Sequence, residues 1–212
     1  MIGKLLALVS IITIAVGAPS KPPAYHPHIF LNLNHTRLIQ CYKKINGVEW
    51  QFSGTGFVIA KNIIVTANHV VTGQSDCVDA ATQLPVKTYY HSNEKDLALL
   101  SVDTGQSDNF QKYSCEGFKK DHHYTSAGYA FGTDLIVNDL IATGKKMTDH
   151  VEDVAPGFDP STLTILKGDI FHGMSGGPIF NDDGFVVGIN TASDGHGTAT
   201  SRALKDTILC KR

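Results

Sequence analysis

One serine lies among three glycines in the segment Gly173-Met174-Ser175-Gly176-Gly177-Pro178. Glycine adopts backbone conformations that other residues avoid, so this segment can form a tight turn that exposes Ser175 and directs backbone N–H groups inward. We predict that the N–H groups of Gly173 and Ser175 form an oxyanion hole, a pair of donors that stabilises negative charge on a reacting oxygen. Taken alone, the segment also fits a glycine-rich β-turn without a chemical role.

A histidine and an aspartate lie beside two apolar strand patterns. His69 ends the segment Thr66-Ala67-Asn68-His69, and Asp96 begins the segment Asp96-Leu97-Ala98-Leu99. A serine hydroxyl becomes a good nucleophile only when a neutral imidazole takes its proton, and a carboxylate must fix the tautomer of that imidazole. We therefore interpret Ser175 as the nucleophile, His69 as the base and Asp96 as its orienting acid. Taken singly, the histidine fits a structural role and the aspartate fits a turn at a strand edge.

Together the three segments resemble the chymotrypsin-like serine protease superfamily. That family carries T-A-A-H around its histidine, D-I-A-L or D-L-A-L around its acid and G-x-S-G-G-P around its serine, in this order along the chain. Two further segments, 54–59 (GTGFVI) and 184–189 (GFVVGI), are similar to strands of the family. The resemblance covers residues 35–205.

The resemblance implies an all-β fold of two perpendicular, antiparallel six-stranded β-barrels with the active site in the cleft between them. His69 and Asp96 would come from the first barrel and Ser175 from the second. The implied function is that of a secreted serine endopeptidase, which hydrolyses the peptide bonds of a protein or peptide substrate through an acyl-enzyme intermediate. The resemblance implies no cofactor and no metal.

Short apolar runs separated by glycine and asparagine also predict antiparallel β structure from the residues themselves. In the first half, Asn46-Gly47 is a hairpin turn signal, and the predicted strands are 37–45, 48–52, 56–60 and 63–67. In the second half, the predicted strands are 124–130, 135–142, 162–166, 178–180, 185–190 and 198–203. Residues 203–209 have helix-spaced apolar positions and predict a short C-terminal helix. Trp50 is expected in the core or at a barrel rim.

The N-terminus has the pattern of a secretory signal peptide over residues 1–17. Lys4 is the only charge before an apolar run at 5–16, which is shorter than the about 20 residues of a membrane span. An uncleaved membrane anchor is the alternative. We expect a secreted or extracytoplasmic protein without stable membrane insertion after cleavage. An extended segment at 18–34, a first barrel at 35–108 and a second barrel at 109–212 would follow.

The composition is that of an ordinary globular protein. Apolar residues make up 42% and charged residues 18% of the 212 residues, and the formal net charge of -2 argues against a nucleic-acid partner. Four cysteines follow the signal pattern and predict two disulfides, with all three pairings open: Cys41, Cys77, Cys115 and Cys210. No spacing of cysteine and histidine predicts a zinc site. The sequence leaves the oligomeric state open.

Position 174 departs from the zymogen-type members of the family, which carry an aspartate there to pair with a newly released N-terminus. Met174 cannot form that ion pair. We therefore predict that activity does not depend on an N-terminal amine entering the core. The methionine and the short spacing from His69 to Asp96 are more typical of bacterial, Deg-type or phage-encoded members than of mammalian trypsins.

The predicted substrate-binding residues are Asp169, His172, Asn190, Thr191, Ala192 and Ser193. Asp169 lies at the offset from the serine at which trypsin-like members bind arginine or lysine, and a simple loop carboxylate is its alternative. Asn190 stands where glutamate-selective relatives carry histidine, which argues against an acidic preference. Residues 191–193 are expected to pair with the substrate backbone by strand addition. His172 is placed at the pocket mouth, or else in a solvated loop.

Two other functions fit parts of the sequence. A catalytically silent binding protein with the protease fold would usually lack a triad residue, and none is missing here. A serine esterase often carries G-x-S-x-G, which residues 173–177 match, but its catalytic residues follow the order Ser, Asp, His. The chain order of His69, Asp96 and Ser175 favours the endopeptidase.

Overall fold

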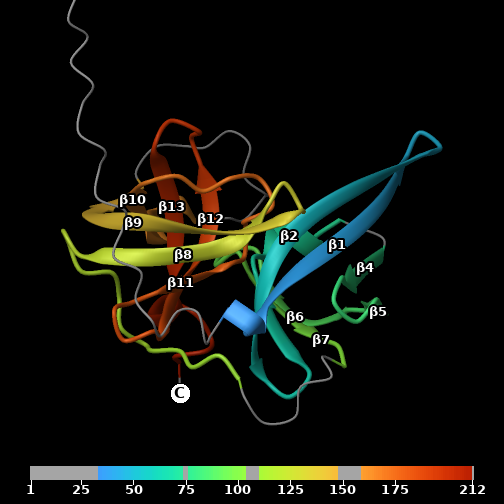
Figure 1. Cartoon of the computed structure of the whole chain (residues 1–212), viewed down its shortest axis with the longest axis horizontal. Helices are drawn as coiled ribbons and strands as arrows, with labels where there is room; N and C mark the ends of the chain where they lie inside the picture. Colours follow the sequence, from blue (N-terminus) through green and yellow to red (C-terminus); the bar gives the residue numbers. More distant parts are fainter. Residues whose placement is uncertain (1–32, 74–75, 104–109, 148–158, 212) are drawn as a thin grey trace, which may run out of the picture.

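The computed structural model describes residues 33–73, 76–103, 110–147 and 159–211. Two β units lie side by side, as Figure 1 shows, and strands dominate both. The all-β prediction is therefore confirmed. The predicted signal peptide and most of the extended segment at 18–34 lie outside the described residues. Within the described ranges, no helix has the length and apolar character needed to cross a membrane.

The first unit is a seven-stranded sheet with the order β5-β4-β1-β2-β3-β7-β6. Its strands are β1 (Thr36–Ile45), β2 (Val48–Ala60), β3 (Ile63–Thr66), β4 (Asp76–Asp79), β5 (Leu84–Pro85), β6 (Lys87–Ser92) and β7 (Leu97–Ser101). The six-stranded barrel expected here is instead a curled sheet, because β4 and β5 extend the edge beside β1. In the described part of the chain, no pairing joins β5 to β6 and closes the sheet.

One long hairpin dominates this unit. Asn46 and Gly47 both have positive φ angles, 51° and 83°, so they form the predicted turn between β1 and β2. The two strands predicted at 48–52 and 56–60 are one continuous strand, because residues 53–55 keep their pairing with β1. The end of the hairpin projects beyond the rest of the sheet (Figure 1). Trp50 lies on this projecting part and is exposed, so its expected place in the core or rim is wrong.

The second unit is a closed barrel with the strand order β10-β13-β12-β11-β8-β9. Its strands are β8 (His123–Ala130), β9 (Asp134–Lys146), β10 (Leu163–Lys167), β11 (Pro178–Phe180), β12 (Val186–Ser193) and β13 (Thr198–Ala203). All six strands predicted in this half are present, with different ends in some cases. The predicted C-terminal helix is only a 3-10 turn, η3 (Leu204–Asp206). Two other short 3-10 turns are η1 (Leu33–His35) and η2 (Pro160–Thr162).

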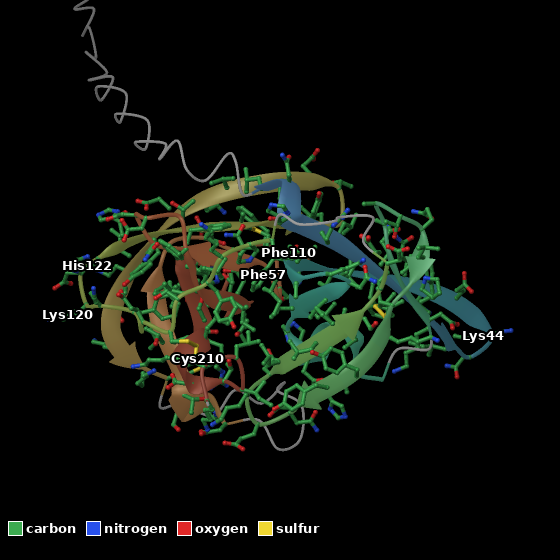
Figure 2. All side chains as sticks on the ribbon, turned by 90° about the horizontal axis from the view of Figure 1, so that it is seen from below. Lys44, Phe57, Phe110, Lys120, His122 and Cys210 are labelled. Carbon is green, nitrogen blue, oxygen red and sulfur yellow. A yellow bond between two sulfur atoms is a disulfide. The ribbon has the colours of Figure 1, made fainter. Side chains whose placement is uncertain are left out.

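One hydrophobic cluster extends across both units, and a second lies within the barrel. Buried residues of the first sheet, such as Phe57, pack in one cluster with Phe180, Val186 and Ile189 of the barrel. Figure 2 shows Phe57 and Phe110 between the two units. Because this cluster crosses the boundary, burial of apolar surface fixes the position of one unit against the other.

Two disulfides fasten the chain, as predicted, and the structure supplies the pairing. Cys41 on β1 bonds to Cys77 on β4. Cys115, which precedes the barrel strands, bonds to Cys210 beyond η3, and Cys210 lies at the barrel in Figure 2. The first bond joins two neighbouring strands of the sheet, and the second joins the segment before the barrel strands to the segment after them.

Candidate active site

His69 and Asp96 form a doubly hydrogen-bonded pair in the first unit. His69 lies on the short helix α2 (Asn68–Val71), directly after β3, and Asp96 lies in the turn before β7. The backbone N–H of His69 donates to Asp96 Oδ1 and its Nδ1 is 2.9 Å from Asp96 Oδ2. A carboxylate accepts hydrogen bonds, so Nδ1 carries the proton and Nε2 is left as an acceptor. The Asp96 side chain is 6% exposed and that of His69 is 40% exposed, which leaves the ring accessible.

The turn that carries Asp96 is held from both units. Its backbone adopts a positive φ of 46°, and its N–H donates to Asn93 O. Asn68 on α2 donates to the Asn93 side chain at 2.7 Å. From the barrel strand β13, the buried Arg202 donates through Nη2 to Glu94 O at 3.3 Å.

The charge of Arg202 is part of this arrangement. Burial lowers the pKa of its guanidinium, and nearby carboxylates, first among them Asp96, oppose that shift. The cation therefore lies in the electrostatic field of the same carboxylate that holds His69. Through its hydrogen bond to Glu94 O, Arg202 links the barrel to the turn that carries Asp96.

The glycines around Ser175 are required by close backbone approach. Gly173 and Gly176 have φ angles of 89° and 81°, a region that side chains rarely adopt. A Cβ atom at Gly173 would collide with the carbonyl oxygen of Tyr129, and one at Gly176 with the Thr66 side chain. The G-x-S-G-G-P pattern therefore reflects the tight packing of this loop against both units.

The Gly173 and Ser175 N–H groups are the free donors of this loop. Phe131 N–H donates to His172 O at 2.6 Å, and in a trans peptide this turns the Gly173 N–H the opposite way. The N–H of Met174 is used differently, since it donates to Phe171 O. Among the described residues, the N–H groups of Gly173 and Ser175 have no hydrogen-bond partner. Two unpaired donors flanking a serine are suited to bind an oxyanion.

The Ser175 hydroxyl faces the barrel in this structure. Its Oγ donates to Thr191 O at 3.3 Å. No hydrogen bond joins it to His69 within the described ranges, although both residues line one pocket. We name this hollow the histidine pocket, and its walls are Gln51, Phe52, Ser53, His69, Val70, His172, Gly173 and Ser175.

Thr55 connects the Ser175 loop to the first unit. Apart from the similarity of segment 54–59 to a strand of the family, no sequence pattern predicted this role. Its hydroxyl donates to Gly173 O at 2.7 Å and accepts from Tyr129 N–H at 2.9 Å. Its own N–H donates to Ser175 O at 2.8 Å. The residue is completely buried. Through its side chain and its backbone, this one residue thus links both predicted oxyanion-hole residues to β2, and its hydroxyl also binds β8.

A second hollow, the side-chain pocket, lies against the barrel. Its walls are Phe131, Ile170, Phe171, His172, Ser175, Thr191, Ala192, Ser193 and Gly195. Four of the residues predicted to bind substrate line this pocket: His172, Thr191, Ala192 and Ser193. The two pockets meet at His172 and Ser175.

Two predicted residues are not in this pocket. Asp169 is exposed beside it, with its backbone carbonyl accepting from Asn138, and the apolar Ile170 lines the wall instead. Asn190 is completely buried and hydrogen-bonds to Ser126 inside the barrel. In each case the next residue lines the wall instead: Ile170 follows Asp169, and Thr191 follows Asn190.

The comparisons with known proteins agree with this geometry. A two-unit β fold with a paired histidine and aspartate facing a glycine-rich serine loop defines the chymotrypsin-like class. Residues 54–189 match the model of the trypsin-like peptidase domain. The chain belongs to this family, and the resemblance inferred from its motifs is confirmed.

The relatives are of the Deg type, as Met174 indicated. A protein of Pseudomonas fulva (strain 12-X), named "Probable periplasmic serine endoprotease DegP-like", is 31% identical over 68% of this chain and 29% of its own length. Serine protease HTRA4 of Mus musculus is 30% identical over 66% of this chain and 29% of its own. The matched region thus spans less than a third of the length of each of these relatives.

A solved structure shares the fold. The Rv3671c protease from M. tuberculosis, in its active form, superposes with a TM-score of 0.72 at 19% identity, over 96% of this chain and 89% of that chain.

Proposed function

We propose that this protein is a serine endopeptidase that uses Ser175, His69 and Asp96. The observation that carries this proposal is the pairing of His69 with Asp96 by two hydrogen bonds, opposite a serine flanked by two unpaired N–H groups. A purely structural role would not require both the His69–Asp96 pair and the unpaired N–H groups at the same pocket. The family membership and the names of the relatives support the same activity.

In the proposed mechanism, a rotation about χ1 brings Ser175 Oγ from Thr191 O toward His69 Nε2. The oxygen attacks the scissile carbonyl while Nε2 takes its proton, and Asp96 stabilises the resulting imidazolium. The N–H groups of Gly173 and Ser175 hold the tetrahedral oxyanion. Nε2 then gives its proton to the leaving amine, and water repeats the cycle on the acyl-enzyme.

The side-chain pocket favours an apolar residue before the scissile bond. Its walls include Ile170, Phe131 and Phe171, and none of its lining residues is acidic. A buried arginine or lysine would therefore lack a counter-charge there. Residues 191–193 of β12 run past the serine and offer backbone groups for strand addition.

We further propose an extracytoplasmic location for the protein. The signal pattern at residues 1–17 supports it, as does the word periplasmic in the name of the Pseudomonas fulva relative. Detection of the protein outside the cytoplasm with Ala18 as its first residue would test both parts.

One observation favours a second candidate, the catalytically silent binding protein. Ser175 Oγ bonds to Thr191 O and not to His69. The esterase alternative loses its structural basis, because the serine is followed by strand β11 and not by the helix of a strand-to-helix elbow.

Labelling with a fluorophosphonate probe separates these candidates. The probe reacts with a serine only where base and oxyanion hole are assembled, so we expect label on Ser175, mapped by peptide analysis. Ser175→Ala should remove the label, and His69→Ala should slow it by orders of magnitude. A folded protein with both disulfides formed and no label would contradict the enzyme and support the silent protein.

A further inference from the structure

A row of apolar side chains lies on the projecting β1–β2 hairpin. Val48, Trp50 and Phe52 alternate along β2, so they point to one face, and Ile45 lies on the same face because it pairs with Val48. We call these four residues the hairpin row. Their exposed fractions are 58% for Val48, 54% for Trp50, 38% for Phe52 and 39% for Ile45. Four large apolar residues exposed together at the end of a hairpin mark an interaction surface.

The row is continuous with the histidine pocket. Phe52 is one wall of that pocket, beside His69 and Ser175. Gly54, the next residue on the same face, packs so closely under Val70 of α2 that a Cβ atom could not fit. From this point the row runs outward along β2 toward the hairpin end, where Lys44 is labelled in Figure 2. A ligand in the histidine pocket can therefore extend directly onto the row.

The mechanism sets which part of a substrate passes this way. His69 must give its proton to the leaving amine, so the residues after the scissile bond leave on the histidine side of Ser175. The side-chain pocket, which takes the residue before the bond, has different walls except for His172 and Ser175. The hairpin row therefore lies along the exit path of the downstream segment.

We propose, on the basis of the proposed function, that the hairpin row binds apolar side chains of the substrate downstream of the scissile bond. A strand advances about 3.3 Å per residue, so Phe52 to Val48 spans about 13 Å, or about four extended substrate residues. Alternate apolar residues would face the row, since an extended ligand has the same period of two.

Trp50 supplies a direct probe of this contact, because it is the only tryptophan in the sequence. We would titrate the Ser175→Ala protein with two tryptophan-free peptides that share the residues before the scissile bond. One continues with alternating leucine and valine, and the other with serine and glycine at the same positions. The first peptide should shift Trp50 emission to shorter wavelength and saturate, and the second should not. Equal response to both peptides would overturn the proposal.

Kinetics supply the second measurement. We expect wild-type kcat/KM to be about tenfold higher for the leucine–valine peptide than for the serine–glycine peptide, as is typical when one aromatic anchor is engaged. Trp50→Ser should bring this ratio close to one. Tyr89→Ser is the matched control, because Tyr89 is 58% exposed on β6 and lies outside the row and both pockets. A ratio near ten in Trp50→Ser, or near one in the wild type, would refute the role of the row.

Sedimentation velocity tests the other occupant, a second copy of this chain. If Trp50→Ser converts a wild-type oligomer into a smaller species, the row is an interface between copies and the substrate proposal fails. The fluorophosphonate probe keeps the two proposals apart. A labelled wild-type protein without peptide preference would contradict the hairpin row alone. An unlabelled one would contradict the endopeptidase, and the inference with it.

Discussion

Removal of the Thr55 hydroxyl group tests how the proposed oxyanion hole is held in position. Thr55→Val keeps nearly the same shape and removes only the hydrogen-bonding group. In the structure that group donates to Gly173 O at 2.7 Å and accepts from Tyr129 N–H at 2.9 Å. The variant therefore leaves a carbonyl and an N–H group unpaired at a completely buried position.

The expected magnitude follows from these two bonds. Each buried group left unpaired costs about 1–3 kcal/mol, so the free energy of unfolding should fall by about 2–6 kcal/mol for the two groups together. Complete loss of one oxyanion donor lowers kcat by about 10²–10³. The effect here should be smaller, about ten- to a hundredfold, because two bonds remain. Phe131 N–H still holds His172 O, and Thr55 N–H still holds Ser175 O.

The assay compares kcat and KM of Thr55→Val with those of Thr55→Ser, together with urea unfolding of both variants. Thr55→Ser keeps the hydroxyl and should stay within about threefold of the wild-type kcat. KM should change less than kcat, since the hydroxyl acts through Gly173 and does not touch substrate. A Thr55→Val protein that loses stability but keeps kcat within twofold of the wild type would refute the positioning role.

Three other expectations follow from the structure. Reduction of both disulfides should lower the free energy of unfolding, because they close loops with sequence separations of 36 and 95 residues. In the chain-entropy model these two loops contribute about 4 and about 5 kcal/mol. An unchanged urea midpoint in reductant would contradict this. Activity should fall in acid, because a protonated imidazole cannot accept the serine proton. A rate that is flat from pH 8 to 5 would exclude a histidine base. Residues added before Ala18 should leave kcat/KM within twofold, because Met174 is completely buried in the barrel core, where no ion pair can form; activity that appears only after trimming to one defined residue would show the opposite.

The serine loop could be predicted from the sequence because its chemistry requires unusual residues. Gly173 and Gly176 stand where a Cβ atom would strike the opposing backbone or side chain, so no other residue fits. The hairpin turn at Asn46 and Gly47 was predictable for the same reason, since both residues need positive φ. Such local constraints restrict which residue types can occur at a position, so a single sequence is enough to predict them.

Contacts between residues far apart in the sequence could not be predicted in this way, because they do not restrict residue type so strongly. Thr55 reaches Gly173 across 118 positions, and a threonine in an apolar strand looks like an ordinary β residue. Asp169 has the expected offset from Ser175, but the local path of the chain brings Ile170 to the wall instead. Trp50 was expected in the core or at a barrel rim, yet the length of the hairpin carries it beyond the core, where it is exposed.

Each unit holds a proposed catalytic group of the other unit, so the proposed site depends on the whole fold. Thr55, from the first unit, fastens the Ser175 loop of the barrel. Arg202, from the barrel, fastens the turn that carries Asp96 in the first unit. Separation of the units would therefore release the nucleophile and the acid together, and not one after the other. It follows that reactivity of Ser175 toward a fluorophosphonate and the folded signal should disappear at the same urea concentration, as expected for one cooperative transition.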